Sequence, residues 1–291
     1  MLPEFDLVMP ENLQQALENL GQRNPGVVPV AGGTNLTVDM RSRRHTPATL
    51  VNIEHIQELT GILQEDDRIE IGSCVTIAEI LKSPIIAAVA PALIEAARGF
   101  ANPLIRNRAT IGGNLADASP AADTAPSLLV HNAQVELWSK KNRRILPLDE
   151  FFVGVRKTVL QPDEIIKSVH VPKTNRPSAS SFYKLGLRKA DAISVASVAV
   201  YLEKKNGACG QVRIAMGSVA PKPLRAYAAE ELLTGKHLSL KLIEEAAKLA
   251  AEASSPISDI RGSAEYRRRM VFVLTRRLLT HLAEMMELKD W

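Results

Sequence analysis

Two diglycine segments are the strongest candidates for chemistry in this sequence. The first diglycine segment is Ala31-Gly32-Gly33-Thr34-Asn35, and the second is Thr110-Ile111-Gly112-Gly113-Asn114. Glycines let the backbone turn several N–H groups into one concavity, and neighbouring Thr and Asn side chains can complete a cradle for an anion. Two such cradles could clamp a diphosphate from opposite sides. A pair of tight turns without any ligand would explain the same residues.

Two charged residues could act beside these segments. Asp123 lies in the run from 118 to 127, which otherwise holds only Ala, Ser, Pro and Thr. Its carboxylate could accept hydrogen bonds from a ribose, or it could cap a helix that begins near Thr124. Lys184 alternates with the apolar residues Tyr183 and Leu185. It lies either on a solvated edge strand or in a groove between domains, where its charge would stabilise an anionic group.

Other signatures of catalysis are missing from the sequence. It has no GxSxG, HExxH, GxxxxGK[ST] or EF-hand motif and no GxGxxG dinucleotide fingerprint. Its six histidines include no pair at metal-ligand spacing, so we expect no metal site. The two cysteines, Cys74 and Cys209, can build neither a disulfide framework nor a cluster held by four cysteines of this chain. We therefore expect no catalytic nucleophile or general base here.

Composition predicts a folded protein of about two domains. The chain has 291 residues, 46% of them hydrophobic and 23% charged, and a net charge of +4. The arginines at 267–269 and 276–277 lie on a predicted helix as a solvated or subunit-facing surface, so we expect no nucleic-acid binding. The longest apolar run, from Ile85 to Ile94, is about half of the roughly 20 residues that a membrane span needs. Since the first residues also lack the apolar core of a signal peptide, we expect a cytoplasmic, reduced protein.

Short strands and helices must position these residues. Apolar spacing predicts a helix over Glu11–Leu20, a helix that starts at Ser83-Pro84, is broken at Pro91 and stops at Gly99, and strands over Val27–Ala31, Leu50–Ile53, Ile69–Ile71, Val135–Trp138, Arg144–Leu146 and Ile165–Val171. The first diglycine segment therefore lies at the end of a buried strand.

A linker and a second domain follow. The segment Pro172–Ser181 is rich in Pro, Ser and Thr, which is typical of a linker. Beyond it we expect strands over Ser181–Leu187, Ile193–Glu203 and Val212–Val219, a turn at Asn206-Gly207, and helices over Leu240–Ala253 and Ala264–Leu288. The sequence thus predicts an α+β domain over residues 1–175 and a smaller domain of sheet and helices over 180–288.

The strings AGGTN, IRNRATIGGNLADASPAAD and FYKLGLRKADAIS carry a resemblance that covers the whole chain. The sequence resembles the FAD-binding subunit of molybdenum-containing hydroxylases, a group that includes xanthine, nicotinate and carbon monoxide dehydrogenases and 4-hydroxybenzoyl-CoA reductase. This resemblance implies two α+β FAD-binding subdomains of the vanillyl-alcohol-oxidase type, followed by a three-stranded antiparallel sheet with helices. It also implies FAD in this chain, and a large molybdopterin subunit and a small [2Fe–2S] subunit as partners.

The resemblance also implies where FAD is held. The two diglycine segments look like pyrophosphate-binding loops, Asp123 matches an acidic residue that holds FAD, and Lys184 matches a lysine beside the flavin ring. Phe100 and Ile166 match apolar residues that flank the adenine. Cofactor contacts are therefore expected at Pro29, Val30, Ala31, Gly32, Gly33, Thr34, Asn35, Phe100, Thr110, Ile111, Gly112, Gly113, Asn114, Asp123, Ile166 and Lys184.

On this resemblance we expect an electron-transfer flavoprotein within a heterotrimer. It would accept electrons from the [2Fe–2S] partner and pass them from FAD to NAD⁺, a quinone, oxygen or another carrier. No cysteine lies between Asn114 and Phe182, so the [4Fe–4S] insert of 4-hydroxybenzoyl-CoA reductase is absent, and hydroxylation or aldehyde oxidation is expected instead. The alternatives are a flavin-free structural subunit and a self-contained flavin oxidase, for which the sequence offers no acid–base group.

Overall fold

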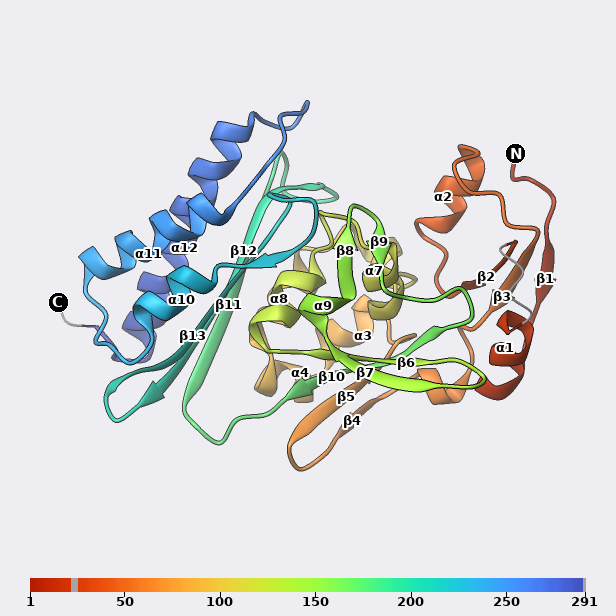
Figure 1. Cartoon of the computed structure of the whole chain (residues 1–291), viewed down its shortest axis with the longest axis horizontal. Coiled ribbons are helices and arrows are strands. Elements are labelled where there is room, and N and C mark those ends of the chain that lie inside the picture. Colours follow the sequence, from red (N-terminus) through yellow and green to blue (C-terminus); the bar gives the residue numbers. More distant parts are fainter. Residues whose placement is uncertain (22–25, 290–291) are drawn as a thin grey trace.

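The fold, seen in a computed structural model that describes residues 1–21 and 26–289, has three parts in chain order. Each part is built on its own sheet, of three, five and four strands respectively, and a two-stranded hairpin accompanies the second. Figure 1 shows the three parts side by side, with the N-terminal sheet at one end and the C-terminal helices at the other.

The N-terminal part is a small sheet with two helices. Its elements are β1 (Asp6–Val8), α1 (Leu13–Leu20), β2 (Val27–Val30), α2 (Leu36–Arg41), β3 (Thr49–Asn52) and the 3₁₀ helix η1 (Gln57–Leu59). The strands are parallel in the order β1-β3-β2. The predicted first helix is confirmed, and it begins at Leu13 because the Asn12 side chain caps it by accepting the Gln15 N–H at 3.0 Å.

The central part is a five-stranded antiparallel sheet covered by helices. Its elements are β4 (Ile62–Gln64), β5 (Arg68–Gly72), α3 (Ile77–Lys82), α4 (Pro84–Val89), α5 (Pro91–Arg98), α6 (Pro103–Arg106), α7 (Ile111–Asp117), α8 (Thr124–Val130), β6 (Gln134–Trp138), β7 (Arg143–Pro147), α9 (Leu148–Phe151), β8 (Phe152–Gly154), β9 (Lys157–Thr158) and β10 (Ile165–Pro172). The sheet order is β4-β5-β10-β6-β7. The predicted helix break at Pro91 is confirmed, because this proline begins α5 directly after α4 has ended.

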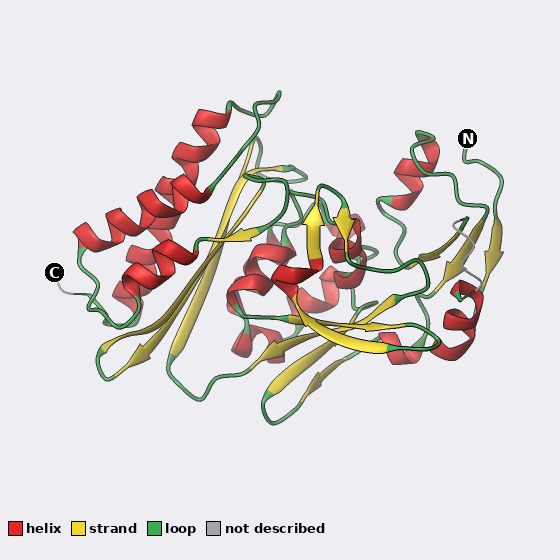
Figure 2. Cartoon of the chain, in the orientation of Figure 1, coloured by secondary structure: helices red, strands yellow, loops and turns green. Residues whose placement is uncertain are grey.

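The C-terminal part is a long antiparallel sheet with helices on both faces. Its elements are β11 (Ser178–Gly186), β12 (Ser194–Lys205), β13 (Ala208–Gly217), β14 (Leu224–Arg225), α10 (Tyr227–Leu233), α11 (Leu240–Ala253) and α12 (Ala264–Met285). Helices α10 and α12 pack on one face, and α5 and α8 of the central part pack on the other. Helices therefore lie both between and outside the two larger sheets (Figure 2).

The predicted boundary between two domains near residue 175 is visible in the sheets but not in the hydrophobic core. β10 ends at Pro172 and β11 begins at Ser178, so the expected linker separates two sheets. However, Phe182, Ala199 and Tyr201 pack into the core of the central part. The boundary near residue 175 therefore stays a prediction.

Several short or irregular features differ from the sequence-based expectation. The C-terminal sheet has a fourth strand, β14, of only two residues, which is too short to give a pattern. Arg267 is not on a solvated surface: it is 3% exposed and donates to the carbonyl oxygens of Val195 and Ser218. In the part of the chain that the structure describes, no helix combines the length and the apolar character that crossing a membrane requires.

Candidate cofactor-binding site

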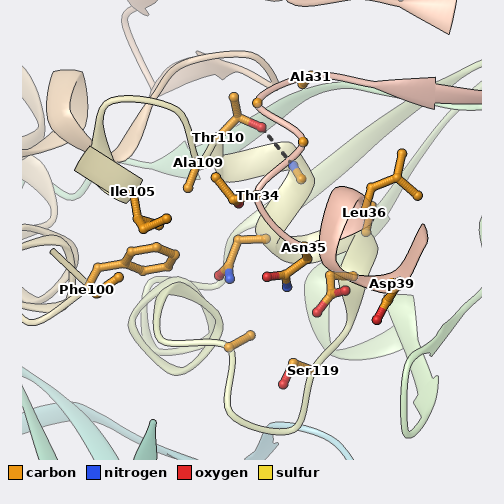
Figure 3. Close-up of a pocket in the computed structure, with 18 of the residues that line it drawn as sticks. Ala31, Thr34, Asn35, Leu36, Asp39, Phe100, Ile105, Ala109, Thr110 and Ser119 are labelled. Carbon is orange, nitrogen blue, oxygen red and sulfur yellow. Dashed lines mark hydrogen bonds between the residues drawn. The ribbon is translucent and has the colours of Figure 1, made fainter. Parts of the chain in front are cut away.

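A cavity of about 940 Å³ lies where the three parts of the fold meet. This volume is near the upper end of the range for ligand sites in proteins, roughly 300–1,000 Å³. Its wall combines the β2–α2 connection, the segment from Phe100 to Asp123, Arg156 on the β8–β9 hairpin, and Lys184 with residues 191–193 from the C-terminal sheet. Figure 3 shows the side chains of the first two segments converging on this space.

The first diglycine segment forms an open cradle at the cavity wall. It connects β2 to α2, and Gly33 turns the chain with a φ of +68°, which a residue with a Cβ rarely adopts. Among the described residues, the N–H groups of Gly32, Gly33, Thr34 and Asn35 donate to no protein acceptor. Unpaired backbone donors need a partner, so this stretch can bind an anion such as a diphosphate.

The second diglycine segment has a different structure: it is the first turn of α7. Thr110 caps this helix, and its Oγ1 accepts the Gly113 N–H at 3.1 Å (Figure 3). The N–H groups of Ile111, Gly112 and Asn114 donate to backbone carbonyls at 2.9–3.0 Å. The hypothesis of a second concavity of free N–H groups is therefore wrong, because capping and packing already use these donors.

Close packing explains the glycines of the second segment. A Cβ on Gly112 would lie 2.5 Å from the Cβ of Ser73, so this position admits no side chain. Among the described residues outside its own helix backbone, a Cβ on Gly113 would meet Thr110 Oγ1 alone, at 2.9 Å, and Gly113 lines the cavity. The first segment lies against the residues that precede the second, since a Cβ on Gly32 would lie 1.6 Å from the carbonyl oxygen of Arg108.

Asp123 and Lys184 form one buried ion pair in the cavity wall. Lys184 Nζ lies 2.6 Å from Asp123 Oδ2 and also donates to the Gly99 carbonyl at 3.1 Å. The lysine side chain is 10% exposed, so the solvated-edge interpretation is wrong. Asp123 occupies the N-cap position of α8 but makes no capping bond, so that alternative is wrong as well.

The environment of Asp123 points to a ligand. Burial raises the pKa of its carboxyl to about 6, although the charge of Lys184 acts in the opposite direction. Its second oxygen, Oδ1, is buried and has no hydrogen-bond partner among the residues that the structure describes. A buried acceptor of this kind calls for a donor, which a molecule in the cavity would provide.

The structure brings thirteen of the sixteen expected contact residues to the cavity. The other three are Ile111, Gly112 and Ile166, which do not line it. Ile166 is 4% exposed and packs in the core of the central part, whereas Phe100 lies in the wall beside Ile105 (Figure 3). The structure thus brings Phe100 but not Ile166 to the cavity, and the expectation that both flank the adenine stays a prediction.

Sequence reasoning missed an ionic cluster in the same wall. Arg156 Nη2 lies 2.5 Å from Asp39 Oδ2 and 2.6 Å from Asp117 Oδ1. These residues come from the β8–β9 turn, α2 and α7, so no spacing along the chain relates them. Asp117 could have been suspected, since it follows the second diglycine segment closely. Arg44, His45 and Ile193 also line the cavity without a sequence signal.

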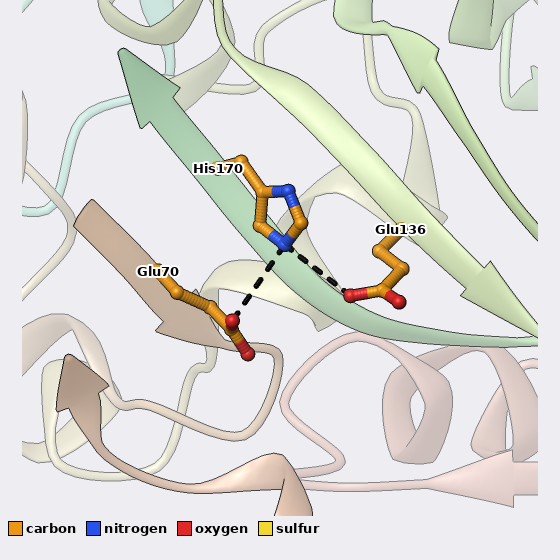
Figure 4. Close-up of side chains that lie close together, drawn as sticks. All are labelled: Glu70, Glu136 and His170. Carbon is orange, nitrogen blue, oxygen red and sulfur yellow. Dashed lines mark ion pairs between the residues drawn. The ribbon is translucent and has the colours of Figure 1, made fainter. Parts of the chain in front are cut away.

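A second polar cluster lies on the central sheet, away from the cavity (Figure 4). His170 Nε2 on β10 is 3.3 Å from Glu136 Oε2 on β6 and 3.8 Å from Glu70 Oε2 on β5. Lys167 pairs with Glu70, so the cluster already contains a cation. Burial is the main cause that lowers the pKa of His170. A search for histidine pairs could not find this group, and the absence of a metal site stays a prediction.

Comparisons with known proteins agree with this geometry. The model of the family described as the FAD binding domain in molybdopterin dehydrogenase matches residues 3–174, and that of the CO dehydrogenase flavoprotein C-terminal domain matches 181–282. The chain is 32% identical to the carbon monoxide dehydrogenase medium chain of Hydrogenophaga pseudoflava, over 95% of this chain and 96% of that one. It is 35% identical to the nicotine 6-hydroxylase medium subunit of Paenarthrobacter nicotinovorans, over 96% and 97%. A solved carbon monoxide dehydrogenase from H. pseudoflava superposes with a TM-score of 0.94 at 33% identity, over 98% and 99% of the two chains.

The fold and the cavity, taken with these matches, define a flavoprotein with an FAD-binding domain. The chain belongs to the FAD-binding medium subunits of the molybdenum hydroxylase family, whose members are subunits of oxidoreductases. The predictions of family, fold class and FAD are confirmed. The residues present fit this cofactor, because free N–H groups, the unpaired Asp123 oxygen and the side-chain-free Gly113 all border the same space.

Proposed function

We propose that this chain is the electron-transfer subunit of a heterotrimeric, cytoplasmic molybdenum hydroxylase. In this proposal a large molybdopterin subunit oxidises the substrate, and a small [2Fe–2S] subunit delivers the electrons to this chain. They leave toward NAD⁺ or another acceptor. FAD, when bound, supplies the chemistry of this junction because it can take up electrons one at a time and release them singly or as a hydride. The observation that carries the proposal is the cavity wall, in which the N–H groups of Gly32 to Asn35 and Oδ1 of Asp123 have no partner among the described residues.

The residues of the chain hold and tune the cofactor. The N–H groups from Gly32 to Asn35 bind the diphosphate, and Thr110 and Gly113 leave room for it on the opposite side. Asp123 Oδ1 accepts a hydrogen bond from the cofactor. Lys184 contributes a positive charge that its pair with Asp123 holds in the wall.

The residues that do not line the cavity act through packing. Gly112 allows α7 to lie against Ser73, and Ile111 and Ile166 are buried among the apolar side chains that support the wall. We therefore assign direct contact to Pro29, Val30, Ala31, Gly32, Gly33, Thr34, Asn35, Phe100, Thr110, Gly113, Asn114, Asp123 and Lys184.

The test uses the assembled complex and the separate full chain. We expect visible flavin absorption that is released on denaturation, and reduction of this flavin by the substrate only when the small subunit is present. A correctly assembled but colourless complex would support the flavin-free structural subunit. Turnover of a small substrate by the isolated, FAD-loaded chain would instead support a self-contained oxidase.

A further inference from the structure

Arg156 joins two parts of the fold across the mouth of the cavity. Its guanidinium contacts Asp39 on α2, in the N-terminal part, and Asp117 on α7, in the central part. The two carboxylate side chains are 13% and 11% exposed, whereas that of Arg156 is 42% exposed. All three residues line the cavity. The link is thus ionic and within reach of water.

The N-terminal part is attached quite differently elsewhere. Leu59, Cys74 and Ile165 belong to one buried apolar cluster that spans the N-terminal and central parts. Backbone bonds reinforce this contact, since the Cys74 N–H donates to the Leu59 carbonyl at 2.8 Å and the Gly72 N–H to the Gly61 carbonyl at 2.9 Å. This contact is buried and apolar, so it can stay intact while the N-terminal part turns about it.

Near the cavity, ion pairs join the two parts in addition to the backbone contact between Gly32 and Arg108. Besides Arg156 with Asp39, Arg108 lies 2.6 Å from Glu54, and that arginine is 54% exposed. Half-exposed ion pairs are individually weak and are screened by salt. The ion pairs that bind the N-terminal part on the cavity side are therefore weaker than its buried apolar contact at Leu59, Cys74 and Ile165.

We propose that Arg156 is a positioning residue that latches α2 over the bound FAD. Its bond to Asp39 holds the cavity closed, because Arg156 itself stands on the β8–β9 turn of the central part. Opening of this bond lets the N-terminal part move about its packed contact and releases the dinucleotide. The inference rests on the proposed function, because FAD is the molecule that the latch retains.

Two isosteric variants separate a latch from a change of charge. Asp39→Asn and Asp117→Asn each remove one negative charge from the same cavity wall, but only Asp39→Asn weakens the link to α2. Asp39 also lies 3.5 Å from Nε of Arg44, within the N-terminal part, so Arg156→Gln is the variant that breaks the latch alone. We expect FAD to leave the full-length Asp39→Asn protein about fivefold faster, as for a loss of ~1 kcal/mol of ion pairing. Release from Asp117→Asn should stay within about twofold of the wild type.

The measurement is the fluorescence of free FAD after dilution of the loaded chain. Added salt should speed release from the wild type and from Asp117→Asn more than from Asp39→Asn. Arg156→Gln provides a second way to break the latch, and the double variant with Asp39→Asn should release FAD no faster than either single variant. Thermal unfolding of each apoprotein checks that the fold is kept.

Equal acceleration by Asp39→Asn and Asp117→Asn would overturn the latch, because the charge of the cavity alone would then control release. An unchanged rate in both Asp39→Asn and Arg156→Gln would overturn it as well. In either case tight FAD binding by the wild type leaves the proposed function intact. A wild-type chain that takes up no FAD contradicts the proposed function itself.

Discussion

The two diglycine segments both contribute residues to the cavity wall, and both contain the dipeptide Gly-Gly. Their backbone N–H groups nevertheless have different roles. In the first, four consecutive residues line the cavity with N–H groups that donate to no acceptor in the described part of the chain. In the second, the donors are used by the N-cap of α7 and by carbonyls of neighbouring segments. The first segment therefore supplies hydrogen bonds, whereas the second supplies space and a rigid wall. A shared sequence pattern does not imply a shared mechanism of ligand binding.

The difference arises from what each segment joins. The first leaves a parallel strand and must reverse direction before α2, so Gly33 takes a positive φ and the N–H groups turn outward. The second follows the short helix α6 and lies against Ser73 of the central part. There the glycines permit close contact between backbones, and the N–H groups of Ile111 and Gly112 donate to carbonyl oxygens of the neighbouring segment.

The largest effects are expected from Gly32→Val, which should lower the affinity for FAD, and from Gly112→Val, which should lower the free energy of unfolding. A side chain on Gly32 collides with the Arg108 carbonyl and forces the first segment out of its place in the cavity wall. Gly32→Val should therefore weaken FAD binding about a hundredfold, near the upper ~3 kcal/mol of overpacking costs. Gly112→Val should instead lower the free energy of unfolding by about 2–3 kcal/mol. Titration with FAD and denaturant unfolding of the apoprotein measure the two effects. If both variants lost FAD equally and unfolded alike, the two segments would not differ in role.

Gly113→Val should lower FAD occupancy while the C-terminal sheet stays folded. The added side chain projects from a residue that lines the cavity and, outside its own helix backbone, meets Thr110 Oγ1 alone among the described residues. We expect a loss of about tenfold in affinity, as for an overpacking cost of ~1.4 kcal/mol. Gly154→Val is the matched control, because a Cβ there meets no atom within 4 Å. Full flavin loading of Gly113→Val would contradict the assignment of this residue to the wall.

The Asp123–Lys184 pair extends the comparison to the charged part of the wall. Lys184→Met should keep FAD bound but lower its reduction potential by about 30 mV, which is ~1.4 kcal/mol for a two-electron couple, because the anionic reduced form loses a favourable charge. Adding Asp123→Asn should restore much of this potential, since the unpaired negative charge is then removed too. Redox titration against a dye of known potential gives both values. An unchanged potential in Lys184→Met would remove this residue from the electronic role.

The smallest expected effect is a pH dependence of apoprotein stability. The pKa of Asp123 is raised from 3.8 to about 6 in the folded protein, so between these values the folded state binds more protons than the unfolded state. The stability that Asp123 contributes is therefore present below pH 3.8 and is lost as the pH rises through 6. Relative to Asp123→Asn, the wild type should lose free energy of unfolding over this interval. Parallel curves for the two proteins would show that this carboxyl does not titrate as described.

Elements with long, regular patterns could be predicted from the sequence. Helices α11 and α12 carry apolar residues at helical spacing and begin after the caps Ser239 and Ser263, and both are found where expected. By contrast, α7 was expected to be a loop, because glycines are poor helix formers and only the Thr110 cap and the contact with Ser73 make this turn helical.

Contacts between distant segments could not be predicted from local patterns. Asp123 and Lys184 were each recognised, but their pairing depends on β11 packing beside α8, which no spacing encodes. Arg156 gave no signal at all, because its two carboxylate partners lie 117 and 39 residues away. Sequence patterns thus identified most of the wall of the site but not the ionic contacts that connect its parts.

All three parts of the fold contribute to the cavity wall, so the order of synthesis determines when the binding site can form. Lys184 and Ile193 complete the wall from β11 and from the turn before β12, so the binding site does not exist until these strands have left the ribosome and paired. A nascent chain that ends before them cannot enclose the dinucleotide, however well its earlier sheets have formed. We therefore expect the complete wall of the cavity to form only after β11 and the turn before β12 have been synthesised.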